Sequence, residues 1–489
     1  MSLIKKLAGQ TIIYGMGSIL PRVLQLIIFT PYLTRIFNEG TYGIHGVMYS
    51  LAGFLLVFLT FRMETAFFRF GSEKGQLEKI YSTTLTVLFI STPLVIGLLW
   101  LNAAPLTSFW SNPEDIDYVK IILLISALDI LVALPFARLR LEERPVKFSI
   151  LKILAVLINL GFIFYFLEFL PQANNAWPSY DINCQLEYVL YANLIASAFT
   201  FIFLLPEILK NNWAIDKVEL KKIIHYSWPL IIVAVAGIIS QLADRPLLNK
   251  LSSGSIEENA IQTGLYAAAV KFAVIMQLFT QAFNYAAEPF FFRQAKEKNA
   301  TQTYADVARA FTFVGSFAFL FVLLFQSELQ YLLGANFRSG LNVLPVLLLA
   351  YLFLGLFYNF SIWYKIKDKT KVGAVIAVIG ALISLSINIV LIPKIGNFAA
   401  AWAAFFTFGA QAMLGYFIGR KYFPVPYRMD KIIGVILLAV GFYFAYNFLV
   451  SDLNLSRIGN LAVSLFFLVG YTLFAFIWER DFCRRILKG

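Results

Sequence analysis

The sequence is poor in the residues that build soluble enzymes. Charged residues make up 14% of its 489 residues, against about 25% in soluble globular domains. It has only two cysteines and two histidines, too few for a disulfide framework or for a metal centre built from these residue types. A disulfide-stabilised scaffold and a metalloprotein with a Cys/His centre are therefore excluded.

Catalytic motifs are also missing. The sequence has no Walker A motif, no paired-histidine zinc motif and no Gly-x-Ser-x-Gly nucleophile motif. The connections between its apolar segments are too short to hold a soluble catalytic domain. We therefore expect that the protein is not an enzyme and that it binds no cofactor.

Long apolar runs dominate what is present. Hydrophobic residues make up 60% of the chain, and its mean hydropathy is +0.74. The chain contains fourteen apolar windows of about 20 residues, each long enough to cross a bilayer. The first lies near residues 11–31 and the last near residues 459–477. The sequence therefore predicts an all-α polytopic membrane protein with about 14 transmembrane helices.

Basic residues alternate between the two sides of this predicted arrangement. The net charge is +12, but the basic residues lie between apolar spans, so we predict no nucleic-acid partner. Segments on the side of the termini are rich in Lys and Arg, whereas the opposite loops hold few: Arg35, Arg245, Lys250, Arg338, Lys394 and Arg457. This bias predicts a multi-pass protein with both termini in the cytoplasm.

Three short patterns occur twice in the same order. The pairs are Pro31–Arg35 with Pro246–Lys250, Thr41-Tyr-Gly43 with Thr263-Gly-Leu-Tyr266, and Glu64–Arg69 with Glu288–Arg293. Together they indicate a duplicated unit. Many transporters are built from internal repeats with the substrate site between them.

Four cations within predicted spans are candidates for binding an anionic substrate. Arg22 and Lys271 lie deepest, and Arg62 and Arg309 lie nearer the cytoplasmic ends. A cation inside the apolar layer needs a cavity or a partner, and Arg and Lys make charge-assisted hydrogen bonds to phosphate oxygens. The alternative for the shallower cations is that they extend to the membrane surface.

Two polar stripes accompany these cations. Ser18, Arg22 and Gln25 share one face of the first helix, and a second stripe on the eighth helix comprises Gln277, Gln281, Asn284 and Glu288. We expect both stripes to face one cavity. The alternative is that they hold packed helices together.

Acidic residues within the spans are candidates for ion coupling. Asp129 lies deep in the fourth span, and Glu64 and Glu288 lie nearer the cytoplasmic ends. Asp129 could instead simply pair with a nearby cation. Two deep cations against one deep acid favour an anionic substrate, whereas an exporter of lipophilic cations is expected to have an acid-rich cavity.

At these residues the chain resembles Wzx-type polysaccharide flippases, a branch of the MOP exporter superfamily that also contains the MATE drug exporters and the MurJ-type lipid II flippases. The resemblance covers nearly the whole chain. It is carried by Pro21-Arg-Val-Leu24, Tyr32–Gly43, Leu139–Arg144, Leu332–Phe337 and Lys365–Lys371.

The resemblance implies a MATE/MurJ-like fold with two pseudo-symmetric six-helix lobes around a central cavity and a C-terminal helix pair. The corresponding ranges are 1–206, 207–417 and 418–489. It also implies alternating access, driven by a proton or sodium gradient in the manner of an antiporter, with Arg22 as a cavity cation.

The substrate implied by the resemblance is an undecaprenyl-diphosphate-linked oligosaccharide repeat unit. The protein would move it from the cytoplasmic to the periplasmic leaflet of the bacterial inner membrane, for O-antigen, lipopolysaccharide or other surface polysaccharide biosynthesis. Membrane lipid and polysaccharide polymerase or chain-length proteins are the further partners expected. The alternatives are a MATE-like cation-coupled drug exporter and a MurJ-like lipid II flippase.

Overall fold

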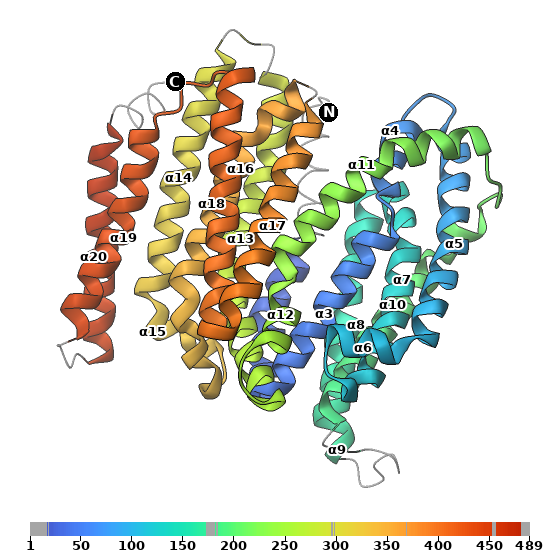
Figure 1. The fold of residues 1–489 in the computed structure, drawn as a ribbon, viewed down its shortest axis with the longest axis horizontal. Coiled ribbons are helices and arrows are strands. Elements are labelled where there is room, and N and C mark those ends of the chain that lie inside the picture. Colours follow the sequence, from blue (N-terminus) through green and yellow to red (C-terminus); the bar gives the residue numbers. More distant parts are fainter. Residues whose placement is uncertain are drawn as a thin grey trace. The chain divides into compact units, whose positions relative to one another are not determined.

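The computed structural model describes residues 17, 19–172, 181, 184–294, 297, 299–367, 369–451 and 456–480. Every regular element among these residues is a helix (Figure 1). Fourteen of the helical stretches are long and apolar enough to cross a membrane. The predicted fold class and number of spans are thus confirmed, as expected where only internal hydrogen bonds satisfy the backbone.

By internal contacts the chain divides into two compact units. The first comprises Met1–Ala267 and Ile392–Gly396, and the second comprises Ala268–Leu391 and Asn397–Gly489. The lobe boundaries predicted from the sequence, at residues 206/207 and 417/418, stay predictions.

The first unit begins with a span over Ile19–Ile36 that contains the π-helical segment η1 (Gln25–Phe29). Its helices are α2 (Thr30–Ile36), α3 (Glu39–Leu59), α4 (Met63–Gly71), α5 (Leu77–Leu101), α6 (Ala103–Trp110), α7 (Ile116–Leu141), α8 (Pro145–Phe164), α9 (Leu170–Gln172), α10 (Gln185–Leu209), α11 (Lys217–Leu242) and α12 (Asp244–Leu251), with a short 3₁₀ turn η2 (Pro113–Asp115) and a second π-helical segment η3 (Tyr165–Phe169).

Helix α13 (Ile256–Gln294) starts in the first unit and continues into the second. The second unit also holds α14 (Ala300–Leu324), α15 (Gln326–Leu329), η5 (Gln330–Leu332), η6 (Ala335–Val343), α16 (Leu344–Ile366), most of α17 (Thr370–Ile395), α18 (Asn397–Tyr422), α19 (Met429–Ser451) and α20 (Arg457–Trp478). Within it α16 packs along α18, and α19 packs on both α14 and α20 (Figure 1).

The internal repeat has a structural counterpart. Pro31 and Pro246 each lie in the first turn of a short helix, α2 and α12, that ends at an extended residue. A capped long helix follows in both copies. Asn38 Oδ1 accepts from the Thr41 N–H at 2.7 Å at the start of α3, and Ser255 Oγ accepts from the Glu258 N–H at 3.2 Å before α13. The two copies therefore share one local design, a short helix followed by a side-chain cap.

The entry motifs of the two copies touch each other. A Cβ added at Gly264 in α13 would stand closer than 3.0 Å to the carbonyl oxygen of Glu39, and one added at Gly43 in α3 closer than 3.0 Å to the carbonyl oxygen of Ala260. Glycine allows backbones to approach this closely because it has no side chain. The repeat motif is thus the crossing point of α3 and α13.

Helix α3 ends in an unusual turn. Phe61 and Arg62 both adopt left-handed backbone conformations, with φ of 48° and 54°, a region that residues other than glycine rarely occupy. The turn separates α3 from α4, so that Glu64 lies in the first turn of a new helix. In the second copy α13 continues unbroken through the matching segment.

Ion pairs join the helix ends of the first unit on the predicted cytoplasmic side. The carboxylate of Glu207 on α10 is buried and pairs with Arg144 at 2.9 Å and with Lys147 at 2.6 Å. On α7, Arg138 pairs with Glu142 at 2.6 Å and with Glu78 of α5. These contacts hold α5, α7, α8 and α10 together where they leave the predicted membrane layer.

Replacing Gly264 by alanine tests the glycine crossing. We expect Gly264→Ala to destabilise the protein by roughly 1–3 kcal/mol, because the new methyl group would overlap a backbone oxygen. Thermal unfolding of the detergent-purified protein measures the effect. Gly97→Ala is the control, since no heavy atom lies within 4 Å of the Cβ added there. Equal melting temperatures for the two variants would contradict the crossing.

Candidate functional site in the first unit

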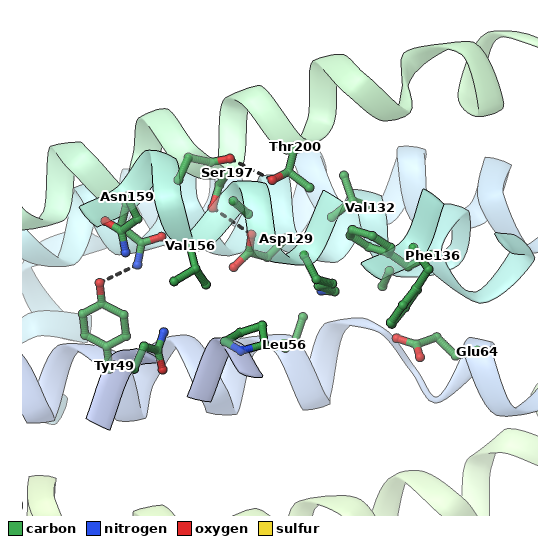
Figure 2. A pocket seen from close by; sticks show the side chains of 18 of the residues that line it. Tyr49, Leu56, Glu64, Asp129, Val132, Phe136, Val156, Asn159, Ser197 and Thr200 are labelled. Carbon is green, nitrogen blue, oxygen red and sulfur yellow. Dashed lines mark hydrogen bonds between the residues drawn. The ribbon is translucent and has the colours of Figure 1, made fainter. Parts of the chain in front are cut away.

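A polar cavity of about 520 Å³ lies inside the first unit (Figure 2). Helices α3, α7, α8 and α10 and the first span supply most of its wall. Its polar lining residues are Gln25, Tyr49, Glu64, Asp129, Arg140, Lys152, Asn159, Asn193, Ser197 and Thr200.

Asp129 stands in the middle of this lining. The hydroxyl of Ser197 on α10 donates to Asp129 Oδ1 at 2.8 Å, which links α7 to α10. Thr200, one turn further along α10, donates its own hydroxyl to the backbone oxygen of Ala196 at 2.8 Å. One hydroxyl therefore supports the carboxylate, and the cavity surrounds the rest of it.

Two cations share the cavity with two carboxylates. Lys152 on α8 places its Nζ 4.0 Å from the centre of the Phe136 ring, a cation–π contact. Arg140 lies 3.4 Å from Glu64 across the space between α7 and α4. The charges of Asp129 and Glu64 are thus matched by those of Lys152 and Arg140, and the cavity is balanced rather than acid-rich or base-rich.

Amide and hydroxyl groups line the cavity away from the Glu64–Arg140 pair. Asn193 on α10 donates to the hydroxyl of Tyr49 on α3, and Asn159 on α8 lies near this pair (Figure 2). The cavity therefore offers charged groups toward the α4 end and neutral hydrogen-bonding groups toward Tyr49. Such a mixture can bind a polar, hydroxyl-rich ligand or a hydrated cation.

Three residues predicted from the sequence line this cavity, namely Gln25, Glu64 and Asp129. Arg22 and Arg62 are exposed and are not among the lining residues. The roles of these two cations stay predictions. Ser18 lies outside the described residues.

The predicted residues of the eighth span fall in the second unit. Lys271, Gln277, Gln281 and Asn284 are half-buried on α13. Glu288 also lies in α13, but its side chain is outside the described part of the chain. The common cavity expected for the two polar stripes stays a prediction.

Arg309 has a partner inside the second unit. Its guanidinium binds the carboxylate of Glu479, directly after α20, through Nε at 3.0 Å and through Nη2. Both side chains are buried. Asp306 lies 3.7 Å away on the same helix. The pair fastens the end of α20 to α14, and the predicted contact of Arg309 with substrate stays untested.

Sequence reasoning missed several cavity residues that share a detectable pattern. Lys152 and Asn159 lie at i and i+7 on α8, and Asn193, Ser197 and Thr200 lie at i, i+4 and i+7 on α10. Each set is one stripe of a helix. Both sets have the same helical spacing as the polar stripe of the first helix.

Comparison with known proteins adds a family and a fold. A family model described as "Polysaccharide biosynthesis protein" matches residues 7–295. No curated protein sequence matches the chain.

Three solved structures resemble the chain over most of its length. One is the lipid II flippase MurJ in an inward closed conformation, 16% identical over 96% of this chain and 99% of that chain, with a TM-score of 0.73. A MATE family multidrug resistance transporter of the MOP superfamily, in an inward-facing conformation, is 12% identical over 84% and 94%, with a TM-score of 0.60. A MOP superfamily transporter from Pyrococcus furiosus is 13% identical over 85% and 95%, with a TM-score of 0.55.

At these identities the similarity shows the fold alone, and it confirms the MATE/MurJ-like architecture predicted from the sequence. The solved structures matched are those of a flippase and of transporters.

The Arg309–Glu479 pair predicts a large stability effect. We expect Glu479→Gln to cost about 3–5 kcal/mol, because the buried guanidinium then loses its closest counter-charge and keeps only Asp306 at 3.7 Å. Replacing both residues by methionine should restore much of the loss. The measurement is the melting temperature in detergent. Glu328→Gln is the control, since its partner Arg457 is largely exposed. A Glu479→Gln protein as stable as this control would show that the pair contributes little.

Proposed function

The chain belongs to the polysaccharide biosynthesis protein family, and from this premise we propose that it is a flippase for undecaprenyl-diphosphate-linked oligosaccharide repeat units. It moves them from the cytoplasmic to the periplasmic leaflet of a bacterial inner membrane by alternating access, and both its termini lie in the cytoplasm. The family match over residues 7–295 carries this proposal. The fold shared with a lipid II flippase supports it.

The cavity of the first unit supports a coupling role in this cycle. Asp129 is a carboxylate within a predicted span with one hydroxyl partner, Ser197, and such a group is a candidate to take up and release a proton or sodium ion. Lys152 lines the same cavity, so binding of a cation at Asp129 changes the charge balance there. In this way the ion gradient sets how often Asp129 is occupied by a cation, and with it the charge of the cavity.

Substrate binding is assigned to cations of the predicted spans. Arg22 is exposed on the first span, where it is accessible to a diphosphate. Lys271 on α13 is the second cation proposed for the diphosphate or for acidic sugars. Polysaccharide polymerase and chain-length proteins are the proposed partners that receive the translocated repeat unit.

The first test is deletion of the gene, followed by extraction of lipid-linked glycans and assignment of their leaflet. Repeat units are expected to accumulate on the cytoplasmic leaflet while the surface polymer is lost. Accumulation of lipid II instead would assign the protein to the lipid II flippases. An unchanged glycan pool with altered sensitivity to lipophilic cations would favour drug export, the function named for one of the structural matches.

Single substitutions separate substrate binding from coupling. Arg22→Ala is expected to reduce surface polysaccharide at a normal level of the protein, because the diphosphate loses a charged donor. Arg69→Ala is the matched control, since Arg69 is an exposed basic residue at the end of α4. Full polysaccharide production by Arg22→Ala would remove Arg22 from the binding site.

For coupling, Asp129→Asn is expected to weaken transport and its response to a collapsed ion gradient. The asparagine side chain has the size of aspartate, but its amide carries no charge and cannot take up and release a proton. Asp117→Asn on the same helix is the control, because Asp117 is exposed and pairs with Lys120 at 3.1 Å. Transport by Asp129→Asn that still follows the gradient as in the wild type would reject this role.

A further inference from the structure

Helix α11 is longer than the apolar layer that it crosses. Its 26 residues, at about 1.5 Å each, span about 39 Å, whereas the hydrocarbon core of a bilayer is about 30 Å thick. Its first turns contain Lys217, Lys221, Lys222 and His225, and its remaining turns are almost entirely apolar. The first turns of α11 therefore belong at the level of the lipid headgroups.

One face of these first turns is fixed to the protein. Glu219, Ile223 and Ser227 recur every four residues and are 7%, 0% and 2% exposed. Tyr226 packs edge-on against Phe70 of α4, with ring centres 5.5 Å apart. Figure 1 shows α11 (green) running from the ends of α4 and α5 past α3 to α12, in agreement with the contacts between these helices.

The start of the helix is fixed as well. Asp216 accepts from the backbone N–H groups of Val218 and Glu219, both at 2.9 Å, and pairs with Lys79 of α5 at 2.9 Å. The N–H of Glu219 and the ammonium group of Lys79 hold the pKa of Asp216 below its ordinary value. The capping carboxylate of Asp216 therefore stays charged, and its partners are the helix N-terminus and Lys79.

The opposite face is exposed in the part of the chain that the structure describes. Val218, Ile224 and Trp228 are 64%, 52% and 62% exposed, and Lys217 and Lys221 lie between them on the helix surface. Among the described residues no carboxylate pairs with Lys217 or Lys221, whereas Lys222 is held by Glu219 at 3.1 Å. A hollow of about 810 Å³ lies along this face, between Lys217 and His225.

We propose that this face of α11, comprising Lys217, Val218, Lys221, Ile224, His225 and Trp228, is a binding site for an anionic phospholipid of the surrounding membrane. Lys217 and Lys221 bind the phosphate of the headgroup, and Ile224 and Trp228 contact the glycerol region and the upper acyl chain. The lipid thus covers the side of α11 that the protein leaves open.

The order of residues along the helix favours a lipid over a protein partner. The cations come first, and the exposed isoleucine and tryptophan follow one to three turns later, toward the apolar layer. A phospholipid presents its phosphate and its chains in the same order. Clustered basic residues next to a span attract anionic lipids, and tryptophan is enriched at the membrane interface.

The test is retention of lipid by the purified full-length protein. The wild type, reconstituted in discs that contain equal amounts of phosphatidylglycerol and phosphatidylcholine, is transferred to detergent, and the lipid that stays bound is counted by native mass spectrometry. We expect phosphatidylglycerol to be retained preferentially. Lys217→Gln with Lys221→Gln should weaken this retention by about tenfold or more, because each lysine near the surface contributes on the order of 1 kcal/mol.

Two further variants make the result specific. Lys217→Arg with Lys221→Arg should keep the lipid, because both charges are retained. Lys74→Gln with Lys371→Gln removes the same charge from two exposed residues elsewhere and should also keep the lipid. Circular dichroism and gel filtration establish that each variant is folded.

Three outcomes would overturn the proposal. One is equal retention by the wild type and the Lys217/Lys221 glutamine variant. Another is equal loss from the Lys74/Lys371 control. The third is preferential retention of added undecaprenyl phosphate over phosphatidylglycerol by the wild type and not by the glutamine variant, which would assign this face to a polyprenyl phosphate. None of these outcomes depends on whether the protein transports a glycan.

Discussion

Within the spans, the backbone polar groups must find their partners inside the protein, because hydrocarbon offers no hydrogen bonds. This constraint explains why all regular elements of the described chain are helices. It also explains why hydroxyl groups along the spans donate to backbone oxygens one turn earlier, as Thr84, Thr200 and Thr312 do. Charges follow the same rule, and the buried Arg309 and Glu479 bind each other.

The cavity of the first unit departs from this rule, because two of its charged residues have no partner of opposite charge in direct contact among the described residues. Asp129 has one hydroxyl partner, and Lys152 contacts an aromatic ring, whereas the buried Glu207 and Arg309 have partners of opposite charge. Space for a ligand or an ion remains between them. A cavity that keeps incompletely paired charges inside a predicted span is costly to maintain, which is why we assign it to the transport cycle.

The architecture could be predicted from the sequence because length and hydropathy determine where a chain crosses a bilayer. The repeat was also visible, since its motifs mark a short helix and a side-chain cap in both copies. The site was harder to predict. The partner of Arg309 is 170 residues away, too far along the chain for a spacing pattern to indicate it. Gln25 begins a π-helical segment, so the spacing rule used for the first helix does not hold beyond it.

The glycine crossing of α3 and α13 determines how these helices can move apart. Side chains at a helix interface can rotate or extend, and they keep partial contact while the helices separate. At Gly43 and Gly264 the backbones themselves meet, and a backbone has no such freedom. A small separation therefore breaks the contact completely, because neither Gly43 nor Gly264 has a side chain that could bridge the gap.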